Sequence, residues 1–284
     1  VAADTNLTTL TCGNNLITNL DVSNLIQLTY LNCGYNQLSN LDVTNLINLK
    51  WLVCSNNMLS TLNTTNLVNL FQLTFSNNLI SSIDLSNITL LSDLFCANNH
   101  LTALSISHLH NLSDLNCSGN QLSTLELPTM TYFHSHHGNV ARSSYNCSNN
   151  LFTTLDFSPI SCNRASIYVA GNPNLTYVNL KNSRTYYNVY SIENCPNLNY
   201  ICINDYPINP SNPYGGIFQN IEDQSILNNI QINPYCSFTP GGIYNTITGT
   251  FSMDIDNNGC DANDFHYSDS KIVINVPSVF NATY

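Results

Sequence analysis

The acidic segment from Asp254 to Asp264 contains the residue types of a cation site. Side-chain oxygens stand at its positions 1, 3 and 5, and Gly259 follows where a sharp turn would need it. Calcium takes about six to eight oxygen ligands, so this density of oxygens predicts a Ca²⁺ site. An EF-hand loop would place a glutamate at position 12, where this chain has Phe265. An acidic turn without metal is the alternative. The candidate ligands are Asp254, Asp256, Asn258, Cys260, Asp261 and Asp264.

Three histidines, His134, His136 and His137, stand close together in a segment that also contains Arg142. Imidazole is a common zinc ligand, and His108 and His110 come shortly before them. The surrounding serine, glycine and asparagine residues equally suit a solvated loop without fixed geometry. No nucleophile or carboxylate is tied to these histidines by pattern, so they predict no catalytic role.

The eleven cysteines form two groups. Six are expected to be buried free thiols at one inward strand position, because parallel side chains point the same way and a disulfide needs them to converge. Among the others, a Cys236–Cys260 disulfide is preferred and Cys202–Cys236 is the alternative. An odd total leaves at least one thiol unless a second chain takes it. The inward six are Cys12, Cys33, Cys54, Cys96, Cys117 and Cys147; the others, outside the regular register, are Cys162, Cys195, Cys202, Cys236 and Cys260.

The positions of these side chains depend on the fold, and the main signal for the fold is a leucine pattern that recurs every 21 residues from Leu7 to Leu127. Within each period, alternate residues such as Leu10 and Cys12 fall on one side of a short strand, which therefore has one buried face. One period alone cannot offset the entropy of ordering its backbone, so neighbouring periods must stack. The pattern predicts a leucine-rich repeat solenoid with a parallel β-sheet and about nine repeats of about 21 residues.

An asparagine recurs where the chain leaves each strand. A buried turn has backbone groups without a ladder partner, and an inward amide can satisfy them. We expect these amides to form a ladder along the solenoid, with a structural role. They are Asn15, Asn36, Asn57, Asn78, Asn99 and Asn120.

The alternation also places two rows of residues on the outward, concave surface of the sheet. Tyr30, Trp51, Val53 and Phe95 are expected to cluster there, and an exposed apolar patch predicts a site for a protein or glycan. Scattered surface aromatics are the alternative. The first row is Thr9, Tyr30, Trp51, Gln72, Asp93 and Asp114, and the second is Thr11, Asn32, Val53, Thr74, Phe95 and Asn116.

A further column of carboxylates would stack about 5 Å apart, where like charges repel by roughly 1 kcal/mol in water. Asn63 and Ser105 interrupt the column. It predicts a solvated acidic edge, with weak cation binding as the alternative. Its members are Asp21, Asp42, Asp84, Glu126 and Asp156.

Composition excludes several classes of partner. Only 8% of residues are charged, and the formal net charge is −11. Nucleic acid and anionic membrane surfaces require clusters of Lys and Arg, and six basic residues cannot supply them. No run of about 18 apolar residues is present, so no transmembrane segment is predicted. Val1 stands in the column of Val22, which suggests that the chain begins inside a repeat as a processed or trimmed product.

The pattern divides the chain into three parts. Residues 1–203 are predicted to form the solenoid, and residues 204–236 a C-terminal cap with a short helix from Gln219 to Asn228. Residues 237–284 are predicted to form part of an all-β, Ig-like or B-type sandwich module, with strands beginning at Tyr244 and Lys271. The chain is expected to end partway through this module.

Several motifs resemble surface leucine-rich proteins of the Bacteroidota. They are the cysteine in the third leucine slot, the runs at 172–175 and 194–201, and the segment from Tyr235 to Asp264. The resemblance implies β-sandwich modules after the repeats, a C-terminal sorting domain, export by the type IX secretion system, and roles in gliding or adhesion. The acidic segment also resembles the calcium-binding turn of B-type modules, which follows a run like Ile247 to Thr250.

These observations predict a secreted or cell-surface protein that is not an enzyme and binds a protein or glycan, as an adhesin does. One alternative is an accessory subunit or cargo docked on the outer-membrane type IX secretion or gliding machinery. Another is the targeting region of a larger secreted enzyme. The expected location is extracellular and associated with the outer membrane, and Ca²⁺ is the one cofactor suggested.

Overall fold

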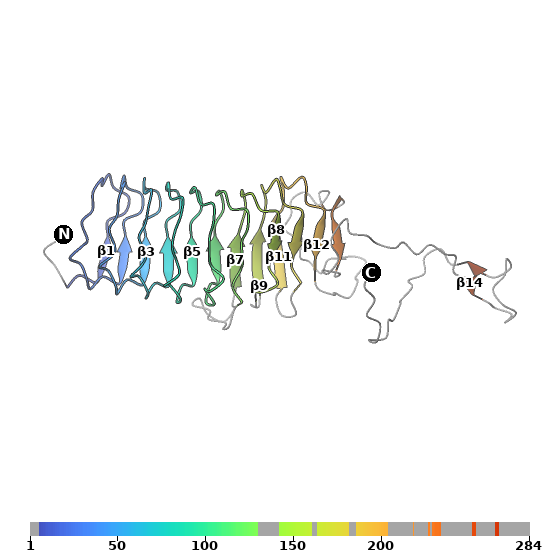
Figure 1. Cartoon of the computed structure of the whole chain (residues 1–284), viewed down its shortest axis with the longest axis horizontal. Helices are drawn as coiled ribbons and strands as arrows, with labels where there is room; N and C mark the ends of the chain where they lie inside the picture. Colours follow the sequence, from blue (N-terminus) through green and yellow to red (C-terminus); the bar gives the residue numbers. More distant parts are fainter. Residues whose placement is uncertain are drawn as a thin grey trace. The chain divides into compact units, whose positions relative to one another are not determined.

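The computed structural model describes residues 6–129, 142–160, 164–181, 186–203, 218, 227, 229–233, 252–253 and 265–266. The chain divides into two compact units, Val1–Ser237 and Phe238–Tyr284. In the first unit, short strands lie side by side along one axis, one after another in sequence order (Figure 1).

The main sheet of the first unit has nine parallel strands. Neighbouring strands pair in register, as Leu31 with Leu52 and Leu52 with Leu73. The sheet confirms the predicted leucine-rich repeat solenoid. In sheet order the strands are β1 (Thr9–Thr11), β2 (Tyr30–Asn32), β3 (Trp51–Val53), β4 (Gln72–Thr74), β5 (Asp93–Phe95), β6 (Asp114–Asn116), β7 (Arg142–Asn146), β9 (Arg164–Tyr168) and β11 (Tyr186–Ser191).

A second parallel sheet, which the sequence pattern did not predict, forms in the later turns. Its order is β13 (Gln231–Asn233), β12 (Tyr200–Cys202), β10 (Tyr177–Asn179) and β8 (Thr154–Asp156). The same part of the earlier turns, such as Leu20 to Val22, is not assigned as a strand. Aromatic and β-branched residues favour strands, and the rings of Tyr177 and Tyr200 stack at 5.7 Å.

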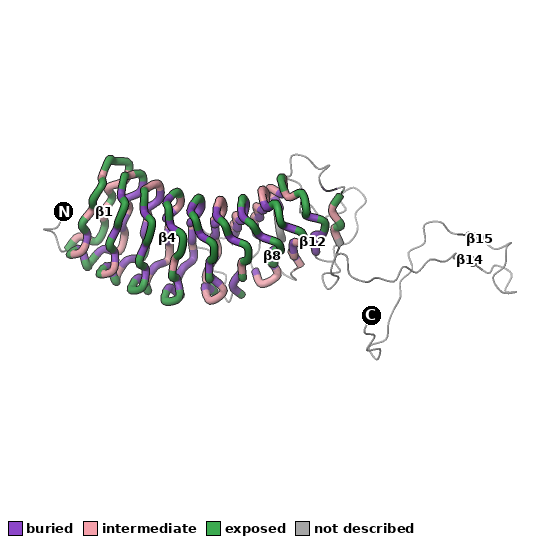
Figure 2. The backbone as a smooth tube through the Cα atoms, turned by 45° about the horizontal axis from the view of Figure 1, so that its top comes forward, coloured by how far each residue is buried: buried purple, intermediate pink, exposed green. Residues whose placement is uncertain are grey.

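The inward leucines form one continuous core. Leu28, Leu31, Leu38 and Leu49 are fully buried, and equivalent residues repeat this in the next turns. In the first turn, Leu7 and Leu10 are only partly buried. Figure 2 shows buried and exposed segments alternating along every turn of the solenoid. Such alternation is what an array stabilised by neighbouring turns requires, because each turn covers the core of the next.

The predicted asparagine column is confirmed as structural, with one difference. Asn57 Nδ2 donates to the carbonyl oxygens of Cys33 (3.1 Å), Cys54 (3.0 Å) and Ser55 (3.3 Å), and its Oδ1 accepts from the backbone N–H of Leu38 (2.9 Å). Each amide therefore bonds to the backbone of two turns, and not to the next amide as a ladder of amides would. The same arrangement recurs, at least in part, at Asn36, Asn78, Asn99, Asn120, Asn150 and Asn172.

Amides that do bond to each other belong to the neighbouring column. Asn98 Nδ2 donates to Asn77 Oδ1 (2.8 Å), and Asn77 Nδ2 donates to Asn56 Oδ1 (3.0 Å). All three residues have positive φ, between 53° and 57°. Asparagine tolerates this left-handed conformation better than most residues, so the column selects it.

Side chains of the acidic column accept hydrogen bonds within the turns of the chain. Asp42 Oδ1 accepts hydrogen bonds from the backbone N–H and the hydroxyl of Thr44 at 3.0 and 2.7 Å. Asp21 makes the same pair of bonds with Ser23, and Asn63 with Thr65. These hydrogen bonds lower the pKa of Asp21 and Asp42. The column is therefore a set of side chains that close turns onto the residue two positions later.

Among the cysteines that the structure describes, seven are free thiols, including all six predicted to be so. The seventh, Cys195, was expected outside the register, yet it occupies the asparagine position of its turn. Its Sγ donates to the carbonyl oxygens of Val169 (3.2 Å) and Glu193 (3.7 Å). Cys202 is disulfide-bonded, and both predicted pairings, Cys236–Cys260 and Cys202–Cys236, involve residues outside the described ones.

In the second unit, β14 (Ser252–Met253) pairs antiparallel with β15 (Phe265–His266), so Met253 faces Phe265. The predicted calcium segment from Asp254 to Asp264 connects these strands and lies outside the described residues. So do the strand expected from Lys271 and most of the helix expected from Gln219. Within the described part of the chain, no helix is long and apolar enough to cross a membrane.

Candidate functional site

The concave face of the main sheet carries the predicted outward residues in unbroken register. Tyr30 pairs with Trp51, Trp51 with Gln72, Gln72 with Asp93, and Asp93 with Asp114. Each step between parallel strands is about 4.8 Å. The three-residue strands bury only their central leucine, so the flanking residues of each strand reach this surface.

Trp51, the single tryptophan of the chain, is 39% exposed on this face. Its ring lies 6.4 Å from that of Phe71, with 34° between the planes. Tyr30 and Val53 are half-buried beside it. Phe71 was not predicted because it directly precedes the strand and falls outside the alternating rows.

Phe95 does not adjoin the other predicted aromatic residues. In register, Val53 pairs with Thr74, and Thr74 with Phe95. Phe95 therefore lies two strands from Val53, and the expected cluster consists of Tyr30, Trp51 and Val53 alone. The reason is that Thr74, a polar residue, holds the intervening position of the second row.

Asp93 and Asp114 are directly opposite each other on neighbouring strands. Both are half-buried, and Asp114 Oδ2 accepts a hydrogen bond from the Ser113 hydroxyl at 3.0 Å. Like charges in directly opposite positions destabilise a sheet. The pair lies in the same row of the concave face as Trp51, which keeps it among the candidate residues for ligand contact.

A second aromatic pair lies farther along the main sheet. Tyr168 of β9 and Tyr190 of β11 stack at 5.2 Å with 17° between their rings. Burial raises the pKa of Tyr168, and the neighbouring Tyr190 adds to the effect. The sequence pattern missed this pair because the step between β7, β9 and β11 is longer than 21 residues and β11 has a register shift near Tyr190.

The histidines do not form a metal site within the described residues. A ring nitrogen of His108 lies 3.0 Å from the carbonyl oxygen of Leu85, and one of His110 lies 2.9 Å from that of Thr129. His134, His136 and His137 lie outside the described part of the chain. Among the residues that the structure describes, no group of three or more His, Cys, Asp or Glu side chains is placed to hold a metal.

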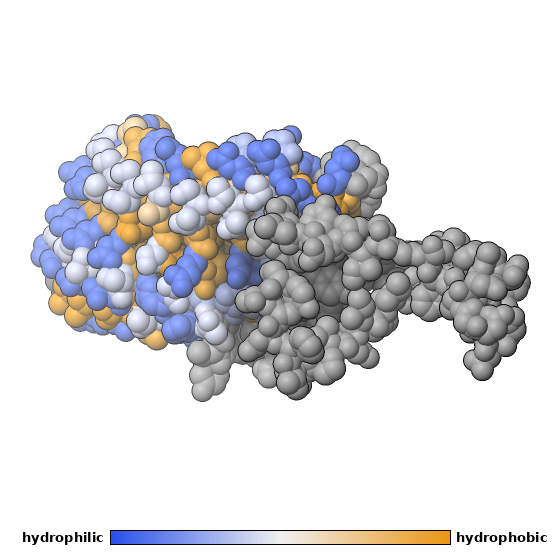
Figure 3. All heavy atoms as spheres, turned by 45° about the vertical axis from the view of Figure 1, so that its right-hand side comes forward, coloured by the Kyte–Doolittle hydropathy of each residue, from blue (hydrophilic) through white to orange (hydrophobic). Residues whose placement is uncertain are grey.

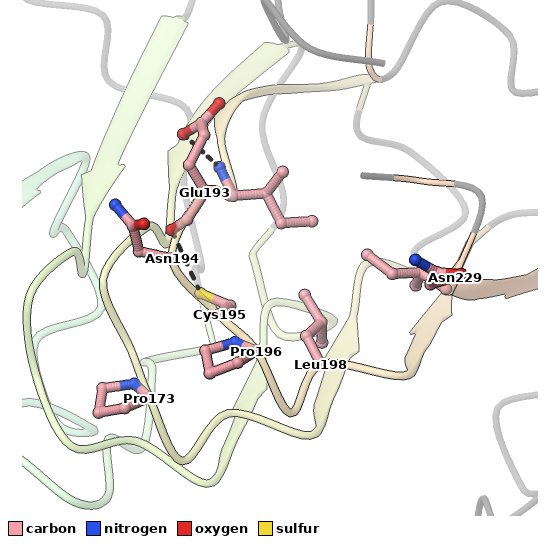
Figure 4. A pocket seen from close by; sticks show the side chains of 9 residues that line it. Pro173, Glu193, Asn194, Cys195, Pro196, Leu198 and Asn229 are labelled. Atoms are coloured by element: carbon pink, nitrogen blue, oxygen red, sulfur yellow. Dashed lines mark hydrogen bonds between the residues drawn. The ribbon is translucent and has the colours of Figure 1, made fainter. Parts of the chain in front are cut away.

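A pocket of about 550 Å³ lies near the last turns of the solenoid (Figure 4). Two of its polar groups are already engaged in the fold. Glu193 Oε2 accepts from the backbone N–H of Ile192 at 3.0 Å, and the Cys195 thiol bonds to the Val169 and Glu193 carbonyls. The pocket is lined by Pro173, Ile192, Glu193, Asn194, Cys195, Pro196, Leu198, Asn229 and Ile230, and this set carries no catalytic pattern.

Exposed apolar side chains also occur away from the concave face. Leu16, Met58 and Leu79 are 79%, 48% and 50% exposed at positions just after the asparagine column. On the side of the molecule shown in Figure 3, hydrophobic residues are interspersed with hydrophilic ones. Trp51 differs from these residues in lying beside a second aromatic ring on the regular surface of the sheet.

No protein-family model and no curated protein sequence matches the chain. Among solved structures, it is similar to the functional domain of InlJ from Listeria monocytogenes, which includes a cysteine ladder. The two are 26% identical with a TM-score of 0.52, over 81% of this chain and 48% of that one. This chain thus spans about half the length of the InlJ structure.

Two more distant structures are an internalin, InlF, from Listeria monocytogenes and a leucine-rich repeat protein of Leptospira interrogans. Each is 18% identical to the chain, with TM-scores of 0.49 and 0.41. The match with InlF covers 82% of this chain and 88% of the InlF chain. The match with the Leptospira protein covers 80% of this chain and 72% of that protein's chain. The repeat register, the nine-stranded parallel sheet and the similarity to InlJ together identify the chain as a leucine-rich repeat solenoid.

Proposed function

We propose that this solenoid is a non-enzymatic binding protein that recognises a protein ligand through its concave face, in an adhesin-like role at the cell surface. The observation that carries the proposal is Trp51, held partly exposed against Phe71 on a rigid, in-register sheet. Tryptophan is strongly enriched among residues that dominate binding energy. A fixed ring on a regular sheet also loses little conformational freedom on binding.

The surface location is supported by the internalin-like fold and by the resemblance to exported Bacteroidota proteins. The same resemblance supports export by the type IX route and association with the outer membrane. Low charge with abundant Asn, Ser and Thr keeps the outward positions polar without basic clusters. These features favour a protein partner over nucleic acid or an anionic membrane.

Calcium binding by residues 254–264 is a second part of the proposal. The segment contributes six candidate ligands and is bracketed by the antiparallel pair β14 and β15. Calorimetric titration of the full chain with Ca²⁺ should show one binding event, and Asp254→Asn with Asp256→Asn should abolish it. An unchanged titration in that variant would assign the heat to another part of the chain.

The test of the concave face compares two exposed apolar residues of the same turn. Trp51→Ala removes the proposed anchor, whereas Met58→Ala removes a side chain that is 48% exposed just after the asparagine column. Binding of the full chain to intact cells and to a panel of immobilised extracellular proteins is measured for both variants. We expect Trp51→Ala to weaken binding by about thirtyfold or more, the range of a central interface residue. Equal binding by both variants would contradict the proposal.

A further inference from the structure

Strand β11 departs from the regular register of the main sheet at Tyr190. Val189 pairs with Ile167 on β9, and the next pair joins Ser191 to Tyr168. Tyr190 is therefore an extra residue between the two pairs, which is the arrangement of a β-bulge. A bulge interrupts the ladder and redirects a side chain, and bulges are over-represented beside functional sites. The side chain redirected in β11 is an aromatic ring.

The bulge places the ring of Tyr190 against the ring of Tyr168. Their centroids lie 5.2 Å apart, with 17° between the planes. Both tyrosines are half-buried, whereas the residues before them, Ile167 and Val189, are buried, so the two rings belong to the outward surface of the sheet. Neither hydroxyl has a hydrogen-bond partner in the described part of the chain. The tyrosine pair, Tyr168 and Tyr190, thus offers a ligand two fixed rings and two hydroxyl groups.

The side chains beside the tyrosine pair are polar and uncharged. Ser144, Ser166 and Asn188 are partners in register across β7, β9 and β11, and all three are half-buried. Their side chains make no hydrogen bond to any residue that the structure describes. Single charges of opposite sign border this group, Asp114 on β6 and Arg164 at the start of β9. Hydroxyl and amide groups therefore provide most of the polar surface here.

Two further amides extend this polar surface away from the rings. Asn146 on β7 and Asn116 on β6 follow Tyr168 in register. The Oδ1 of each accepts a hydrogen bond from the backbone N–H two residues later, at 3.1 Å in both cases. These bonds hold the amides in place and leave each Nδ2 as a donor without a partner among the described residues. From β11 to β6 the surface spans three strand steps, or about 14 Å at about 4.8 Å per step.

From this arrangement we infer that the tyrosine pair and the neighbouring amides bind a neutral oligosaccharide. A sugar ring has an apolar face of C–H groups, which packs on an aromatic ring, and an edge of hydroxyls, which donate and accept hydrogen bonds. The length of the polar surface exceeds one sugar ring, so the ligand has several. Nucleobases also stack on tyrosine, but their phosphates require a cluster of Lys and Arg, and the described side chains of this surface include Arg164 alone.

The oligosaccharide site is separate from the proposed protein site at Trp51. Strand β3, which carries Trp51, lies five strand steps from β9, which carries Tyr168. This separation is about 24 Å at about 4.8 Å per step. The inference therefore adds a second class of ligand and does not depend on the contact at Trp51.

The test begins with the full chain on an array of linear neutral oligosaccharides built from glucose, galactose, mannose or N-acetylglucosamine. Oligosaccharides that contain sialic or uronic acid serve as the competing class. Calorimetric titration then measures the affinity of the best neutral binder for the parent chain and its variants. We expect binding of a neutral oligosaccharide, with no tighter binding of the acidic ones.

The variants separate the rings from the hydroxyls. Tyr190→Ala removes one ring and should weaken binding about tenfold or more. Tyr168→Phe with Tyr190→Phe keeps both rings and removes both hydroxyls, so binding should weaken about three- to tenfold. Tyr35→Asn is the matched control, because Tyr35 is a 61% exposed tyrosine with positive φ at a position where other turns have Asn. The control and Trp51→Ala should bind within about twofold of the parent chain, and circular dichroism verifies that each variant is folded.

Binding of acidic oligosaccharides alone, or of none on the array, would overturn the inference. Equal affinity of Tyr190→Ala and Tyr35→Asn would also overturn it, as would unchanged affinity in the double phenylalanine variant, which keeps the packing of the rings. If Trp51→Ala abolishes oligosaccharide binding, the sugar binds at Trp51 and the assigned site is wrong. Binding of Trp51→Ala to cells and proteins tests the proposed protein site by itself, so the two proposals can fail separately.

Discussion

The side chain of Asn78 joins two turns of the solenoid, because its Nδ2 donates to the carbonyl oxygen of Cys54 in the preceding turn at 3.1 Å. The same nitrogen donates to Phe75 O at 2.9 Å, and Oδ1 accepts from the backbone N–H of Leu59 at 3.0 Å. Asn78 is only 5% exposed. One buried amide thus satisfies backbone groups that have no partner in the sheet.

Replacing this amide should be costly. Asn78→Leu keeps the approximate size of the side chain but leaves the backbone N–H of Leu59 buried without its partner. It also removes one of the two amides that donate to each of the carbonyls of Cys54 and Phe75, which keep only Asn57 and Asn99. We expect a loss of about 3 to 5 kcal/mol in the free energy of unfolding. Asn87→Leu is the control, since its exposed amide makes one long contact of 3.5 Å with Thr65 O. Urea denaturation followed by circular dichroism measures both, and a loss below about 1 kcal/mol for Asn78→Leu would contradict the assigned role.

Gly119 should tolerate asparagine but not valine. Its φ is +65°, and an added Cβ would meet Asn98 Oδ1 at 2.2 Å. Asn98 would have to turn away and give up its bond to Asn77. Both substitutions add this Cβ, but asparagine already occupies the same backbone conformation at Asn77 and Asn98. Gly119→Asn should therefore cost about 1 kcal/mol, the value of the lost hydrogen bond, and Gly119→Val about 2 to 3 kcal/mol. Thermal unfolding of the two variants measures the difference, and equal midpoints would be inconsistent with this explanation.

Stability should fall at alkaline pH because of the inward thiols. Burial raises the pKa of Cys33 from 9.0 to about 12, and the pKa values of Cys54 and Cys96 are also raised by burial. Above pH 9 the unfolded chain releases protons that the folded chain retains, so the contribution present below pH 9 is lost between about pH 9 and 12. Urea midpoints measured under reducing conditions should therefore decrease from pH 8.5 upward.

The control for the alkaline effect is Cys33→Val. Phe75 shows that this inward position accepts an apolar side chain. The variant keeps every tyrosine, which also titrates near pH 10, and removes one thiol. Its midpoints should fall less steeply with pH than those of the parent chain. Identical slopes would mean that Cys33 does not contribute.

The repeat made the main sheet predictable because one rigid period sets the register of every strand. Leu10 and Cys12 mark the inward positions of the first turn. Because the period repeats, Trp51 and Asp93, which hold alternate positions several turns later, are expected to face outward. The contacts of single side chains were harder to predict where the two partners belong to different columns of the repeat. Phe71 packs on Trp51 from outside the alternating rows, and the turn contacts of Asp42 depend on Thr44 two residues later.

The later turns were less predictable because their period changes. The second sheet forms only where several successive turns have strand-forming residues at equivalent positions, as with Val178 and Ile201, which pair in register. Cys195 takes an asparagine position that its residue type did not indicate, since a thiol can donate to the same kind of carbonyl that an amide does. Tyr168 and Tyr190 meet across a register shift that no fixed period anticipates.

The central claim is that the ligand covers the concave face at Trp51, and the fluorescence of this residue tests it most directly. Trp51 is the single tryptophan of the chain and is 39% exposed, so its emission reports on one site. Saturating the full chain with a protein that it binds should shift the emission to shorter wavelength and reduce quenching by acrylamide. A ligand that binds while both the emission and the quenching stay unchanged would place the binding site elsewhere and contradict the claim.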